Sequence, residues 1–203
     1  MIVWRSMGLA LGVLCCAAGV RPVVAAGEDT DWPCIQRLVP EIAPAVIWAG
    51  PPLGSVDGHE PSPAIDQLAE ELAARRVPLA EAQEHVDAFA KTLDDRQKAE
   101  QLTRLFARTL EIINRDRTSI IQGIKKYARG ERALAESITE KNERLSGLPA
   151  DQVLEREALI AERDWDIRIY DDRRSSLTYL CEQPVLLEQR AFALARALAG
   201  HLE

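Results

Sequence analysis

The sequence predicts an all-α protein: a long, coiled-coil-like antiparallel helical hairpin projects from a small helical body, after a proline-rich irregular N-terminal arm. Apolar residues recur at steps of three and four over residues 95–145, the spacing of one helix face. At about 1.5 Å per residue such a helix is on the order of 75 Å long. A Ser-Gly-Leu-Pro turn at residues 146–149 returns the chain toward Cys181. We therefore expect a hairpin over about residues 95–181.

The first 26 residues have the composition of a secretory signal peptide. Residues 1–7 carry one arginine and no acid, residues 8–20 are apolar, and small residues precede Gly27. This pattern predicts cleavage after Ala26. The apolar run is short for a bilayer-spanning helix, so we expect no stable membrane anchor after cleavage. The protein is therefore expected to be periplasmic or secreted.

The mature chain is acidic and holds two cysteines. Removing residues 1–26 takes two of the 25 Lys and Arg and none of the 32 Asp and Glu, which leaves a net charge of −9. Such a balance argues against nucleic-acid binding. In an exported protein, Cys34 and Cys181 most economically form one disulfide, although two free thiols are the alternative. Closing so long a loop is worth roughly 5 kcal/mol in the chain-entropy model.

Residues 27–61 form the arm. Five prolines between residues 33 and 52 exclude a long helix. The segment nevertheless contains Trp32, Trp48 and several aliphatic residues, which a disordered chain would lack. We interpret it as an extended segment pinned by Cys34 and laid along the helices, with the two tryptophans as anchors. Binding of a partner by the arm is the alternative.

Residues 62–203 are expected to form the α-helical domain. Ser62 and Pro63 are typical of a helix start, and the first helix should end near Arg75. A second helix opens at Pro78. After this helix the apolar residues continue on the opposite face of the helical pattern. Asp94 with Gln97 resembles a capping box, so a new helix should begin there.

The far end of the hairpin is expected to close back on the body. Pro184 should end or kink the returning helix. Residues 185–202 should then form a last helix that packs with the first two around the disulfide, because an isolated alanine-rich helix is unstable.

The charges predict a register for the hairpin. With the turn near Leu148, facing residues should have numbers that add to about 297, which places Arg129 near Asp166. Trp165 lies off the predicted apolar seam, so it should face the arm or a partner. Exposed ion pairs contribute little energy but help to select a register.

One polar cluster stands in the middle of the long helix. Arg115, Asp116 and Arg117 should lie near the residues that precede Pro184. They would form either a buried network that holds the hairpin to the body or an anion-binding patch, and we favour the network.

The sequence shows no organised chemistry. No two of the three histidines are spaced to share a metal, and no nucleotide-binding, haem-attachment or nucleophile motif occurs. We expect no cofactor, metal site or catalytic residue. The leading hypothesis is a non-enzymatic scaffold or accessory protein that binds a protein partner, or itself, through the hairpin. The alternative is a carrier or chaperone that holds an apolar ligand or an unfolded chain between arm and helices; a small-molecule ligand is less expected.

Overall fold

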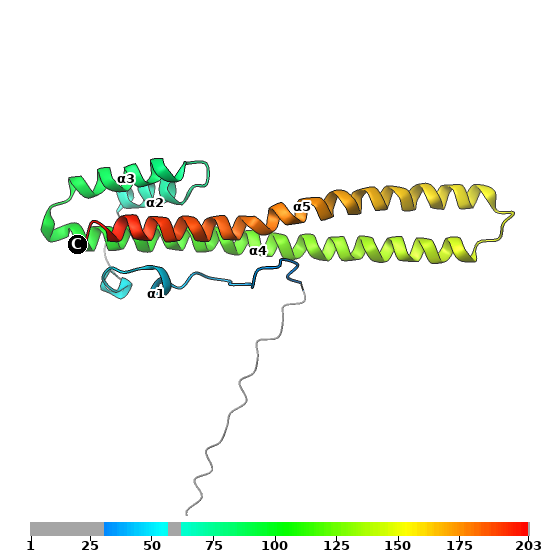
Figure 1. Ribbon diagram of the computed structural model, residues 1–203, viewed down its shortest axis with the longest axis horizontal. Helices are drawn as coiled ribbons and strands as arrows, with labels where there is room; N and C mark the ends of the chain where they lie inside the picture. The colour runs from blue at the N-terminus through cyan, green and yellow to red at the C-terminus, as the bar shows by residue number, and fades with distance from the viewer. Residues whose placement is uncertain (1–30, 57–61, 203) are drawn as a thin grey trace, which may run out of the picture.

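The computed structural model describes residues 31–56 and 62–202, and within them it is all-α. Two long helices run side by side as an antiparallel hairpin. Two shorter helices cover one end of the hairpin, and the arm follows its opposite side (Figure 1). The helices are α1 (Pro44–Ile47), α2 (Pro63–Ala73), α3 (Leu79–Thr92), α4 (Asp95–Gly147) and α5 (Val153–Ala199), with a 3-10 turn at Leu53–Val56. The predicted signal peptide lies outside the described residues.

The helix starts follow the local signals in the sequence. Pro63 opens α2, and its fixed φ suits the first helical turn. The Asp94 carboxylate accepts hydrogen bonds from the backbone N–H groups of Arg96 and Gln97, at 3.0 and 3.1 Å, so it caps the N-terminus of α4. The expected break before Asp95 is therefore confirmed.

The hairpin register differs from the prediction by about one helical turn. Tyr127 bonds to the Arg173 carbonyl at 3.2 Å, and Arg117 bonds to the Pro184 carbonyl at 3.3 Å, so facing numbers add to 300 or 301. The connecting loop spans residues 148–152, and its centre lies beyond Leu148. The predicted pairing of Arg129 with Asp166 is consequently wrong.

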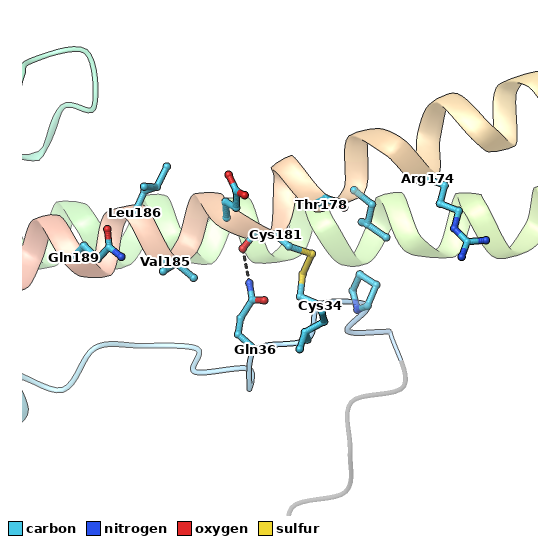
Figure 2. Close-up of a pocket in the computed structure, with 12 residues that line it drawn as sticks. Cys34, Gln36, Arg174, Thr178, Cys181, Val185, Leu186 and Gln189 are labelled. Carbon is cyan, nitrogen blue, oxygen red and sulfur yellow. Dashed lines mark hydrogen bonds between the residues drawn. A yellow bond between two sulfur atoms is a disulfide. The ribbon is translucent and has the colours of Figure 1, made fainter.

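Helix α5 runs without a break through Pro184, whereas the sequence predicted a separate last helix from Val185. The ribbon shifts sideways close to Cys181 (Figure 2). Proline cannot donate a bond to the Leu180 carbonyl, and its ring crowds the preceding turn. Neighbouring carbonyls gain partners from elsewhere: Gln36 donates to Cys181, and Arg117 donates to Pro184. These bonds attach the distorted turn to the arm and to α4, and the helix continues through it.

The body forms where α2 and α3 pack on the hairpin. Its core is a continuous apolar cluster from α2, α3, α4 and the last turns of α5, with Ile42 of the arm. The buried Arg190 of α5 donates hydrogen bonds to the carbonyls of Leu72 and Val77. A cation at the C-terminus of α2 also interacts favourably with the helix dipole. The predicted body is thus present.

Candidate interaction surface

The arm is fastened to the middle of α5 by a disulfide. Cys34 and Cys181 are joined with a Cα–Cα distance of 5.6 Å (Figure 2). Two residues after Cys34, the side-chain amide of Gln36 donates a hydrogen bond to the Cys181 carbonyl. The predicted disulfide is therefore present, and it lies at the boundary between the body and the projecting part of the hairpin.

Beyond the disulfide the arm is held by α4. The Asn114 side chain bonds to both backbone groups of Ile42, at 2.9 and 3.1 Å. The Trp48 ring stacks on Phe106 with centroids 4.2 Å apart and planes 6° from parallel. Stacked aromatic rings add about 1 kcal/mol to their burial. The structure thus places Trp48 in an intramolecular contact.

At its other end the arm reaches the projecting hairpin. Trp32 is half-buried, and its indole N–H donates to the Gln36 carbonyl at 2.7 Å. Asp31 accepts hydrogen bonds from Arg129 and Arg132 of α4. These two guanidinium groups hold the pKa of Asp31 below its usual value. Arg129 therefore pairs with the arm instead of with α5.

The three residues of the predicted polar cluster separate. Arg115 and Asp116 are exposed and lie 3.6 Å from each other. Arg117 is only 2% exposed, and it donates to the carbonyls of Pro184 and Val39 at 3.3 and 3.1 Å. Burial lowers the pKa of Arg117, while the Glu188 carboxylate at 3.6 Å opposes this shift. Arg117 therefore joins α4, α5 and the arm, and the other two residues do not share its contacts.

The projecting part of the hairpin is held by polar contacts as well as by the buried Leu145 and Leu159. Lys141 of α4 donates to the Asp166 carboxylate of α5, and both side chains are more than four-fifths buried. The Arg156 guanidinium caps the C-terminus of α4 through the carbonyls of Leu145 and Leu148, at 3.2 and 2.6 Å. The charge register predicted other partners for Asp166, because it was centred on Leu148.

The ion pair between Lys141 and Asp166 predicts a pH-dependent contribution to stability. The hydrogen bond from Lys141 lowers the pKa of Asp166 from its ordinary value of 3.8. A carboxyl group whose pKa is lowered by folding stabilises the fold at pH values above its ordinary pKa. This contribution is lost as the pH falls through the lowered pKa. Asp166→Asn should therefore lower the melting temperature at about pH 6 and have little effect at about pH 2. The matched variant Asp171→Asn, at an exposed site, should differ little from the wild type at either pH. A loss of equal size at both values would contradict the assignment.

The exposed faces of the two long helices differ in composition. Helix α4 has no large exposed hydrophobic side chain along its whole length, whereas α5 has several. The outward face of a hairpin helix is normally charged, as it is on α4. The large exposed hydrophobic residues of α5 are Val153, Leu154, Trp165, Ile167, Tyr179 and Leu186.

Four of these residues form what we call the outer row: Leu154, Trp165, Tyr179 and Leu186. Trp165, Tyr179 and Leu186 are spaced by multiples of seven residues, and Leu154 precedes Trp165 by eleven, so all four share one side of α5. Trp165 follows Arg163 by two residues and precedes Asp166 by one, and both of those contact α4. At about 100° per residue the Trp165 side chain points away from the seam.

Trp165 and Tyr179 are 60% and 67% exposed, so most of each ring contacts solvent. The Arg168 guanidinium lies 5.4 Å from the centre of the Trp165 ring, a cation–π contact that leaves the ring accessible. Trp165 was expected to face the arm or a partner, and its ring is largely exposed to solvent. Leu186, an apolar residue of the segment that was expected to form the last helix of the body, is about half exposed. The signal in the sequence that places Leu186 on the outer row is its seven-residue spacing from Tyr179.

Within residues 31–56 and 62–202, no cluster of three or more His, Cys, Asp or Glu side chains is arranged to hold a metal ion. No helix of that part of the chain is both long and apolar enough to cross a bilayer. No protein-family model, curated protein or solved structure matches the chain significantly. The outer row is thus identified from its geometry alone.

Proposed function

We propose that this is an exported, non-enzymatic helical protein that docks a protein partner, or a second copy of itself, through the outer row of α5. The observation that carries the proposal is the contrast between the charged face of α4 and the exposed aromatic residues of α5. Trp and Tyr are the residues most enriched where protein interfaces concentrate their binding energy. An exposed apolar row on a helix is also the usual form of helix-mediated recognition.

The architecture suits this role. The projecting part of α5 extends far from the core of the body and contributes little to it (Figure 1). The disulfide and the Arg117 contacts fix the base of the projection, so a partner would meet a surface already ordered. The disulfide also favours an oxidising compartment, which supports the proposal of export.

The test is affinity capture of the tagged, exported protein under mild crosslinking, followed by mass spectrometry. Trp165→Asp/Tyr179→Asp should lower the affinity for the captured partner at least about 100-fold, because each side chain is expected to contribute about 2 kcal/mol or more. Both side chains are exposed, so the melting temperature should change by no more than about 2 °C. A captured second copy would appear as a dimer in light scattering.

The matched control replaces two exposed residues of α4, as Glu136→Ala/Glu143→Ala. Both side chains are exposed, and neither has a hydrogen bond or ion pair within the described residues. This variant should capture the partner as the wild type does. Equal capture by the outer-row variant, or equal loss by the control, would contradict docking through α5.

A further inference from the structure

A groove lies beside the disulfide, between the arm and α5 (Figure 2). It has a volume of about 530 Å³, within the range of sites that bind small molecules. Because its two walls come from segments about 145 residues apart in sequence, hydrophobic periodicity gives no sign of it. The groove shares only Leu186 with the outer row, so what it binds does not depend on the docking function proposed above.

The lining of the groove is mostly apolar. The disulfide, Leu177 and Val185 contribute half-buried surface, and Ile35 and Leu186 add exposed surface. Ile35 is fully exposed, at 105% of its reference area, although it borders an apolar depression. The isolated chain thus leaves a concave hydrocarbon surface in water, which an apolar ligand would cover.

The dimensions favour a chain-like ligand. The lining residues extend from Arg174 to Gln189 along α5, a length on the order of 22 Å. A helix with side chains is about 10 Å across, so a helical segment of that length fills well over about 1,500 Å³. The groove holds about a third of that volume. A single extended hydrocarbon chain fits these limits, and a helix does not.

One end of the groove carries a cation, and the acidic residue of the lining, Glu182, lies eight residues further along α5. Arg174 is exposed, and its side chain has no ion-pair partner among the residues that the structure describes. A guanidinium group binds a carboxylate through two parallel hydrogen bonds. The Gln36 amide, also in the lining, already donates to the Cys181 carbonyl, so it is committed to the fold.

We propose that the groove binds one monomeric long-chain carboxylate. Its hydrocarbon chain would lie along Leu177, Val185 and Ile35, and its carboxylate would pair with Arg174. Of the outer row only Leu186 borders the groove, and no protein partner is required for this binding, so the two proposals can fail independently.

Calorimetric titration of the delipidated, disulfide-bonded protein tests the proposal. The probes are dodecanoate, tetradecanoate and hexadecanoate, each kept below the concentration at which it forms micelles, together with uncharged hexadecanol. Affinity should rise with chain length by up to about fourfold per added methylene group, since each buried methylene contributes a fixed increment. Hexadecanoate should bind more tightly than hexadecanol.

Three variants locate the site. Ile35→Asp changes a fully exposed side chain, so the protein should fold normally and lose hexadecanoate binding at least tenfold. Arg174→Gln should abolish the preference for hexadecanoate over hexadecanol and leave hexadecanol binding unchanged. Leu154→Asp, on the outer row and outside the groove, should bind all four probes as the wild type does.

Several outcomes would overturn the proposal. The wild type could fail to bind hexadecanoate at about 100 µM, or bind the three carboxylates with an affinity that does not depend on chain length. Ile35→Asp could also bind hexadecanoate as tightly as the wild type does. Cosedimentation with phosphatidylglycerol vesicles without binding of the monomeric probes would also overturn it, because the ligand would then be a membrane surface.

Discussion

Removing the disulfide, as in Cys34→Ser/Cys181→Ser, should lower the free energy of unfolding by about 3–5 kcal/mol. The bond joins residues 147 apart, and closing such a loop in the unfolded chain is worth about 5 kcal/mol in the chain-entropy model. Structure retained in the unfolded chain reduces that figure. For a chain of this size the melting temperature should fall by on the order of 10 °C. Urea denaturation of the wild type, the double variant and the reduced wild type would measure the loss.

The same variant should loosen one part of the arm and leave another in place. Residues near Ile42 and Trp48 keep their contacts with Asn114 and Phe106. Residues 31–37 lose their covalent attachment and retain only the contacts of Asp31 and Gln36 with the hairpin. Amide hydrogen exchange should therefore speed up in residues 31–37 and stay slow near Ile42. A loss of stability below about 1 kcal/mol, or uniform loosening of the whole arm, would contradict this account.

Replacing the buried guanidinium in Arg117→Met should cost about 2–4 kcal/mol of stability. Methionine fills similar space but leaves the carbonyls of Pro184 and Val39 without their donor and Glu188 without its nearby cation. Arg117→Lys should lose less, since it keeps the charge but cannot span both carbonyls in the same geometry. Urea denaturation of the three proteins would rank them.

Arg115→Met is the matched control for Arg117→Met. Arg115 is two residues away and exposed, and among the described residues its ion-pair partner is the adjacent Asp116 at 3.6 Å, so its replacement should change stability by less than about 0.5 kcal/mol. Equal stability of the two methionine variants would contradict the assigned role of Arg117. It would instead favour the alternative that these arginines bind an anion.

The fold class followed from sequence because its signals are local or unambiguous. Apolar steps of three and four define α4, Asp94 defines its first residue, and the two cysteines that remain after the predicted cleavage leave one pairing. The register was wrong because the loop over residues 148–152 is longer on the α5 side than the turn sequence indicated.

The remaining differences concern contacts that link distant parts of the chain. Proline normally ends or kinks a helix, whereas α5 continues through Pro184. Gln36 and Arg117, far away in sequence, donate to the carbonyls of Cys181 and Pro184 in this region. The outer row was missed because its residues are recognised by their exposure to solvent, which spacing does not show. Leu186 has the spacing of a core residue in the last helix and is nevertheless exposed. Sequence spacing cannot distinguish a buried apolar residue of α5 from an exposed one unless the positions of α2 and α3 are known.

Photo-crosslinking in intact cells tests the docking proposal most directly. A photoreactive amino acid would be placed at position 165, 172 or 179 on α5, or at position 122, 136 or 143 on α4. Our account predicts that the α5 positions give a specific adduct with one partner protein, or with a second copy of the chain. The α4 positions should give no adduct. Adducts from α4 alone, equal adducts from both helices, or none from α5 would contradict it.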